Sequence, residues 1–166
     1  MSKILTIVRH GKSDWDYMNL SDYDRPLKLR AYSDAYKMAE ALKKRPNTPD
    51  LFLSSPANRA LYTAVIYART MDHSFGKIKI LDELYMGNPN SIVRLLKKQD
   101  NSFNHLAIFG HNPGFTELAN YYLPEYLDNV PTSAYVWLEF NADSWEKISP
   151  DILTDHEFNY PKKNHP

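Results

Sequence analysis

The sequence lacks cysteine altogether, although it is 166 residues long. Thiol catalysis, zinc–thiolate sites, iron–sulfur clusters and disulfide bonds are therefore excluded for this chain. An excess of charge of either sign is also missing, because 20 Lys and Arg residues balance 20 Asp and Glu residues. A net charge of zero provides no overall field toward nucleic acid or an anionic membrane. We expect neither as a partner, and any anion site must be built locally.

Long apolar runs are absent as well. No apolar segment approaches the roughly 20 residues that a membrane-spanning helix needs, and the stretch from Ile4 to Val8 is shorter than the hydrophobic region of a signal peptide. We therefore expect a cytoplasmic protein. The length and the 43% hydrophobic content suit one domain with a substantial core. We place this domain at residues 1–153 and expect residues 154–166 to form a C-terminal tail that lies over the surface or is partly disordered.

Short apolar strands alternate with helical patterns along the chain. β-Branched and apolar runs predict strands at Lys3 to Val8, Asp50 to Ser54, Lys77 to Leu81, Leu106 to Phe109 and Ala134 to Phe140. Apolar spacing and helix-starting prolines predict helices from Leu29 to the basic residues 43–45, from Pro56 to Ala68, from Ser91 to Lys98 and from Pro113 to Tyr122. This alternation predicts an α/β fold, a three-layer α/β/α sandwich with a mainly parallel central sheet.

Three polar segments follow directly after predicted strands. They are Arg9-His10-Gly11, Ser54-Ser55-Pro56 leading to Arg59, and Gly110-His111-Asn112-Pro113. In an α/β sheet such segments meet at the carboxyl ends of the strands, where ligands bind. Arginine presents a fork of N–H donors that matches a tetrahedral oxyanion, and imidazole can attack, donate a proton or form a hydrogen bond. The pattern therefore predicts a phosphate pocket.

These residues resemble the histidine phosphatase superfamily, which is phosphoglycerate mutase-like, and most closely its short SixA-like phosphohistidine phosphatases. The resemblance rests on segments that occur in the family's order, namely residues 8–13, 25–27, 54–60 with Thr63, 81–84, 110–113 and 132–134. It covers roughly residues 3 to 153. Family members generally have Thr or Ser after Arg-Pro-Leu and Gly three residues later, where this chain has Lys28 and Ala31.

The resemblance implies a role for each matching residue. It makes His10 the nucleophile that becomes phosphorylated, and it makes Arg9, Arg59 and His111 ligands of the phosphoryl oxygens. Glu83 matches the family's proton donor, which an alcohol leaving group needs more than a phosphorylated imidazole does. Further candidates for lining the substrate pocket are Ser13, Ser55 and Asn112. No metal and no cofactor are expected, because cationic side chains can stabilise the charge on the equatorial oxygens.

Two neighbouring arginines should also keep His10 uncharged and nucleophilic, because like charge disfavours the imidazolium form. Only 28 positions separate Glu83 from His111, whereas the larger mutase-like members of the family carry a long cap insertion there. An uncapped pocket would admit a phosphohistidine on the surface of another protein. The expected function is therefore a phosphatase that removes phosphate from phosphohistidine on a protein, through phosphorylated His10.

The expected partners are a phosphorylated protein, such as a phosphohistidine-carrying domain, or a small phosphate ester, with phosphate ion as the product. Three other functions stay open at this point. One is a small-molecule phosphomonoesterase or mutase of the same superfamily, and another is a non-catalytic module that binds a phosphorylated ligand. The third is metal-dependent hydrolysis with His10, His111 and Glu83 as ligands, which two arginines aimed at the same place disfavour by repelling a cation.

Overall fold

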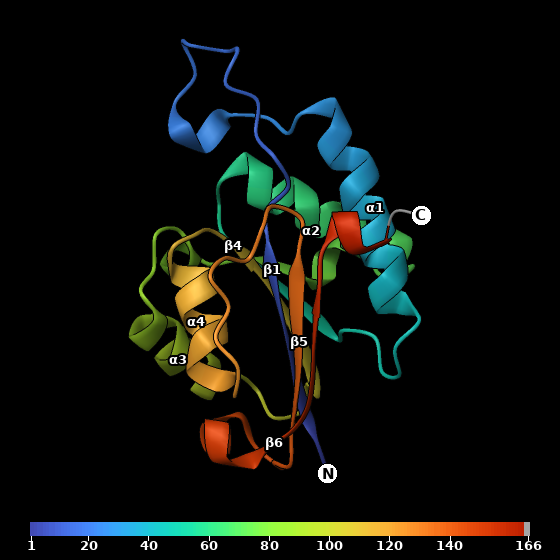
Figure 1. Cartoon of the computed structure of the whole chain (residues 1–166), viewed down its shortest axis with the longest axis vertical. Coiled ribbons are helices and arrows are strands. Elements are labelled where there is room, and N and C mark those ends of the chain that lie inside the picture. Colours follow the sequence, from blue (N-terminus) through green and yellow to red (C-terminus); the bar gives the residue numbers. More distant parts are fainter. Residues whose placement is uncertain (165–166) are drawn as a thin grey trace.

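A six-stranded sheet lies between two layers of helices in this computed structural model, which describes residues 1–164 (Figure 1). The strands are β1 (Lys3–Arg9), β2 (Leu51–Ser54), β3 (Ile78–Ile80), β4 (His105–Gly110), β5 (Tyr135–Phe140) and β6 (Leu153–Asn159), in the order β3-β2-β4-β1-β5-β6. Neighbours among the first four in this order run parallel, whereas β5 pairs antiparallel with both β1 and β6. The predicted mainly parallel sheet is confirmed.

Four α-helices cover the two faces of the sheet: α1 (Leu29–Lys43), α2 (Asn58–Thr70), α3 (Pro89–Lys97) and α4 (Gly114–Tyr122). Side chains alternate along β1, so that Ile4 and Val8 pack in one core with α1 and α2. Leu5 and Ile7 pack in the other core with α3 and α4. Each such fully buried side chain contributes about 1.5–3 kcal/mol. The predicted three-layer sandwich is confirmed, because β1 is buried on both faces.

Two helices begin two residues away from their predicted first residues. The helix expected from Pro56 begins at Asn58, because the backbone of Ala57 is extended and its N–H donates to the Ser55 hydroxyl at 3.2 Å. The helix expected from Ser91 begins at Pro89. Its N-cap is Asn88, whose side chain accepts a hydrogen bond from the Ser91 N–H at 2.9 Å, as a capping asparagine followed by proline favours.

The prediction of a C-terminal tail at residues 154–166 is wrong for residues 154–159, which belong to β6. This edge strand pairs with β5, and Asn159 lies opposite Tyr135. Phe158 packs against the core, and Arg45 forms ion pairs with Asp155 and Glu157. Residues 165 and 166 of the expected tail lie outside the described residues. None of the helices within residues 1–164 is long and apolar enough to cross a membrane.

Between β1 and α1 the chain makes a long excursion, residues 10–28, which projects above the carboxyl ends of the parallel strands (Figure 1). Its base is closed by an isolated bridge between Ser13 and Leu27 and by the hydrogen bond from the Asp14 N–H to the Pro26 carbonyl at 2.8 Å. Inside the excursion lies one turn of 3-10 helix, η1 (Asp22–Asp24). The excursion therefore places a polar turn beside the strand ends at which a ligand is expected.

Candidate active site

The predicted phosphate residues come together at the carboxyl ends of β1, β2 and β4. The parallel register pairs Arg9 with Gly110, which brings the segments after β1 and β4 side by side. The ring centroids of His10 and His111 lie 5.1 Å apart. Both histidines line a cavity of about 470 Å³, together with Arg9, Arg59, Ser13 and Asn112. Six of the eight predicted site residues thus share one cavity.

The hydrogen bonding of His10 leaves one of its ring nitrogens unprotonated. Its Nδ1 lies 2.6 Å from the carbonyl oxygen of Gly11, and because a carbonyl only accepts hydrogen bonds, Nδ1 carries the proton. Burial, reinforced by the charges of Arg59 and Arg9, lowers the pKa of His10 to about 4, although the bond to Gly11 acts in the opposite direction. The ring is therefore uncharged at neutral pH, and its Nε2 lone pair is available for attack.

The turn after His10 depends on the absence of a side chain at Gly11. A Cβ there would lie 3.1 Å from the Cβ of Ala31 and 3.1 Å from the side chain of Leu27. The Gly11 N–H donates to Thr63 Oγ1 at 3.0 Å, which ties the turn to α2. Ala31, one of the two departures from the family pattern, thus packs directly beneath this turn.

His111 is oriented by Ser55 from the neighbouring strand end. Its Nε2 lies 2.7 Å from Ser55 Oγ, a hydroxyl that also accepts from the Ala57 N–H. Burial, together with the nearby His10 and Arg59, lowers the pKa of His111 to about 3. Its Nδ1 is buried and has no hydrogen-bond partner in the described chain. When Ser55 donates its hydroxyl hydrogen to Nε2, Nδ1 carries the proton of the uncharged ring and can donate to an oxyanion.

The two arginines reach the cavity from different elements. Arg9 ends β1 and donates from Nη1 to the Val130 carbonyl at 3.0 Å, while its buried Nε has no partner among the described residues. Arg59 lies in the first turn of α2 and donates to the main-chain carbonyl of Asp22 at 2.6 Å. Since a guanidinium carries five N–H donors, both side chains keep donors for a bound oxyanion.

Asp22 is a site residue that the sequence analysis missed. Its carboxylate accepts hydrogen bonds from Arg25 at 2.6 Å, from Arg59 at 3.0 Å and from the hydroxyl of Tyr85, and it lines the cavity. Burial alone would raise the pKa of Asp22, but the hydrogen bonds from Tyr85, Arg25 and Arg59 outweigh this effect and hold the pKa well below its ordinary value. The one signal in the sequence was that Asp22 precedes Arg25 by three residues. This signal is weak, because carboxylates in loops are usually solvated.

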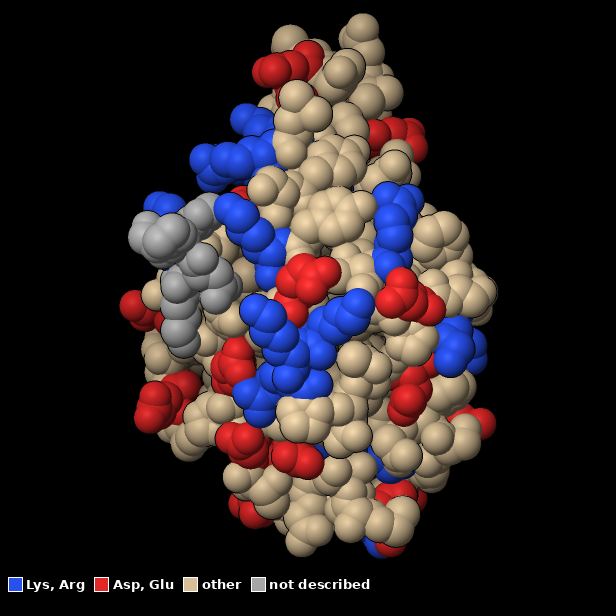
Figure 2. All heavy atoms as spheres, turned by 90° about the vertical axis from the view of Figure 1, so that its right-hand side faces the viewer, with Lys and Arg blue, Asp and Glu red and all other residues tan. Residues whose placement is uncertain are grey.

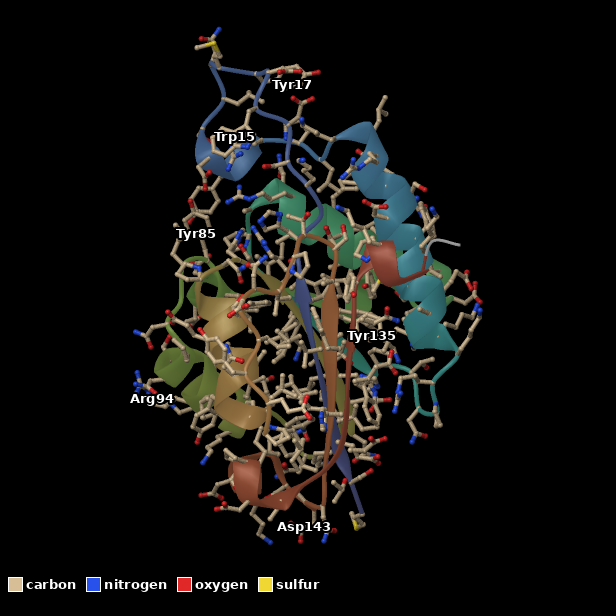
Figure 3. The ribbon with its side chains drawn as sticks, viewed as in Figure 1. Trp15, Tyr17, Tyr85, Arg94, Tyr135 and Asp143 are labelled. Atoms are coloured by element: carbon tan, nitrogen blue, oxygen red, sulfur yellow. The ribbon has the colours of Figure 1, made fainter. Side chains whose placement is uncertain are left out.

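The rim of the cavity is aromatic. Arg25, which also donates to Ser13 Oγ at 2.8 Å, stacks on the ring of Trp15 at 3.5 Å. Tyr85 meets His111 edge to face, with ring centroids 5.3 Å apart, and stacks on Tyr23. In Figure 3, Trp15 lies on the excursion above the strand ends and Tyr85 lies below it on the same side. The mouth of the cavity is therefore bounded by rings from segments far apart in the sequence.

Ser55 and Glu83 are the two predicted site residues that do not line the cavity. Ser55 acts behind His111, through the hydrogen bond described above. Glu83 lies in the 3-10 turn η3 (Asp82–Leu84) and is exposed. Within residues 1–164 no three His, Asp or Glu side chains form a group that could hold a metal, so His10, His111 and Glu83 do not form the ligand set that metal-dependent hydrolysis would use.

Comparison with known proteins agrees with the expected family. Residues 5–108 match the family model of the histidine phosphatase superfamily, branch 1. An uncharacterized chloroplastic protein of Arabidopsis thaliana is 29% identical over 157 residues, which cover 89% of this chain and 71% of that protein.

Solved structures agree as well. SixA of Agrobacterium tumefaciens superposes with a TM-score of 0.75 and 26% identity, over 83% of this chain and 92% of that chain. The protein histidine phosphatase SixA complexed with tungstate superposes with a TM-score of 0.76 and 22% identity, over 96% of this chain and 98% of that chain. The expected SixA-like fold is confirmed. Since the family model matches more than half of its residues, the chain belongs to branch 1 of the histidine phosphatase superfamily, a membership that supports phosphatase activity.

Proposed function

We propose that this protein removes phosphate from phosphohistidine on another protein, in two steps and through phosphorylated His10. The observation that carries the proposal is the environment of His10. Its uncharged ring shares one cavity with Arg9, Arg59 and His111, and its proton is held on Nδ1 by the Gly11 carbonyl. A tetrahedral phosphoryl group in this cavity would meet a nucleophile and cationic donors together.

In the first step, His10 Nε2 attacks phosphorus while the bond from phosphorus to the substrate's imidazole nitrogen breaks. The electron pair of that bond goes to the leaving nitrogen. A substrate imidazole that is protonated on its other nitrogen leaves as neutral imidazole, so no proton has to be donated to the leaving nitrogen. The exposed position of Glu83, outside the cavity lining, suits such a leaving group.

In the second step, water attacks phosphorus and the bond from phosphorus to His10 Nε2 breaks, which returns the electron pair to Nε2. The water proton leaves with the phosphate product or to solvent. During both steps Arg9, Arg59 and the Nδ1–H of His111 stabilise the negative charge on the equatorial oxygens. While His10 is phosphorylated, the Gly11 carbonyl accepts the Nδ1–H of the charged ring. Fixed donors of this kind supply charge stabilisation that a metal ion would otherwise supply.

The entrance of the cavity supports a protein substrate. The chain between Glu83 and His111 is occupied by α3 and β4, which are part of the three-layer body, and it contains no cap segment. Trp15 and Met86 line the cavity and are 69% and 67% exposed. A phosphohistidine side chain on a macromolecule can therefore approach without an enclosing lid. The SixA structure with tungstate, whose name describes a protein histidine phosphatase, shares this fold.

Phosphate release tests the proposal directly. Wild type, His10→Ala and the matched control His156→Ala, at an exposed position on β6, would be compared in excess chelator on a phosphohistidine-bearing protein and on an aryl phosphate. We expect release by wild type and the control, loss of at least a thousandfold in His10→Ala, and a radiolabelled phosphoenzyme that only the proteins with His10 form. Full turnover by His10→Ala would refute the mechanism. Strong selectivity for a small phosphate ester would refute the substrate.

A further inference from the structure

A groove of about 760 Å³ adjoins the catalytic cavity. It runs between α4 and the segment at residues 126–129. Asn112, the residue after His111, lines both the groove and the cavity. Its size lies within the range of about 300–1,000 Å³ that is usual for ligand clefts. A substrate whose phosphoryl group lies at His10 and which extends past Asn112 therefore enters this groove.

Side-chain hydrogen bonds fix the walls of the groove. Asn112 accepts from the N–H and the hydroxyl of Thr116 at 3.1 and 2.9 Å and donates to Asn129 at 2.8 Å. Asn120 bonds both the N–H and the carbonyl of Leu127, each at 2.8 Å. Because these bonds join α4 to the following segment, the groove exists before any ligand binds, and little ordering entropy is lost on binding.

The groove is acidic, in contrast to the cationic cavity beside it. Glu117 and Asp128 line the groove and no Lys or Arg does, and neither carboxylate has an ion-pair partner in the described part of the chain. Residues 99–146 contain seven Asp and Glu but no Lys or Arg. Lys and Arg instead gather elsewhere, for example on the face that carries α1 (Figure 2). The zero net charge thus hides a local excess of negative charge in residues 99–146.

Two exposed rings complete the groove. Tyr126 is 79% exposed and Tyr121 is 45% exposed, and both line it. Tyrosine rings attract Lys and Arg side chains through their faces, and carboxylates attract the same cations. Rings and carboxylates together in one groove therefore favour a cationic ligand of extended shape over a neutral or an anionic one.

We propose that this groove binds a segment of the phosphorylated protein that carries Lys or Arg next to the phosphohistidine. The inference rests on the proposed function and adds the sequence preference of its substrate. The phosphoryl group lies among the arginines of the cavity, while the cationic side chains of the same segment lie against Glu117, Asp128 and Tyr126. A substrate with negative charges at these positions is repelled.

Two phosphohistidine peptides of equal length test the inference, one with Lys and one with Gln flanking the phosphohistidine. At low salt we expect wild type to favour the Lys peptide about tenfold in kcat/KM, from two exposed charge pairs and one cation–π contact. The variant Glu117→Gln with Asp128→Asn should bring the ratio to about one. An aryl phosphate, too small to reach the groove, should react equally with wild type and variant, which shows that the variant is folded.

The matched control is Glu40→Gln with Asp151→Asn, which changes charge by the same amount at exposed positions outside the groove and should keep the preference. Equal rates for the two peptides in wild type would overturn the inference and leave the proposed function intact. A preference that survives the groove variant would overturn it as well. Hydrolysis of the aryl phosphate without release from either peptide would overturn the proposed function, and this inference with it.

Discussion

On acidification, His10 should stay uncharged down to a far lower pH than an ordinary histidine does. Burial and the charges of Arg59 and Arg9 lower its pKa to about 4. With an ordinary pKa of about 6.5, only about 3% of an imidazole is uncharged at pH 5, whereas a pKa of about 4 leaves about 90% uncharged. The nucleophilic form should therefore be some thirtyfold more abundant at pH 5 than in an unperturbed histidine.

The assay is a titration of the histidine Cε1 protons by NMR, with the resonance of His10 assigned by its loss in His10→Ala. It is restricted to the pH range in which the far-ultraviolet circular dichroism of the protein stays constant. We expect the His10 resonance to keep its neutral-form shift down to about pH 5, and we expect Arg59→Met to move its midpoint upward. A midpoint near 6.5 in the wild type would refute the reasoning.

The same shifts predict how stability depends on pH. The pKa values of His10 and His111 in the folded protein, about 4 and about 3, lie below the value of about 6.5 in an unfolded chain. Below pH 6.5 the unfolded state therefore binds more protons than the folded state, so the free energy of unfolding falls as the pH falls. Urea unfolding between pH 4 and 6.5 should show this loss, with a shallower slope in His10→Ala. A flat dependence would contradict it.

Three substitutions test other parts of the structure. Glu83→Gln should lower kcat/KM for phosphohistidine less than threefold, since the side chain lies outside the cavity lining; a hundredfold loss would show that it reaches the leaving group. Gly110→Ala places a Cβ 2.5 Å from the ring of Phe115, and differential scanning calorimetry should record a destabilisation of about 1–3 kcal/mol, whereas an unchanged Tm would contradict that packing. Asp22→Ala removes an acceptor shared by two arginines, so inhibition by vanadate should weaken about five- to tenfold. Tighter inhibition would instead mean that the carboxylate competes with the oxyanion.

The core of the site was predictable because it depends on strand ends. Arg9, His10 and His111 follow short apolar runs, and the carboxyl ends of parallel strands meet at one edge whatever the details of packing. Arg59 follows the same logic, because it lies in the first turn of α2, shortly after the end of β2. The direction of the His10 pKa shift was also predictable, since it needs only the neighbouring positive charges. Burial, which is the larger cause of that shift, was not part of the prediction.

Two features of the structure were not predicted, the strand β6 and the position of Asp22 in the site, because both depend on contacts between distant segments. The strand β6 has a mostly polar sequence, because as an edge strand it is held mainly by backbone pairing with β5 and by the ion pairs of Arg45, and only Leu153 and Phe158 pack against the core. Asp22 is one of several acids in a polar loop, and only its spacing of three residues from Arg25 distinguishes it from Asp14 or Asp24. Only the folding of the excursion back onto α2 brings it to Arg59, 37 positions away.

Some features of this protein belong to its amino-acid order and are present before the chain folds. The absence of cysteine, the alternation of apolar strands and helices, and the placement of arginine and histidine after strands are properties of the chain that no packing can change. Folding determines which donors are desolvated, which carboxylate binds the arginines, and which acids and tyrosines line a groove beside the cavity. These properties depend on contacts such as Arg9 with Val130, 121 positions apart, and burial and distance between such segments exist only once the chain has folded.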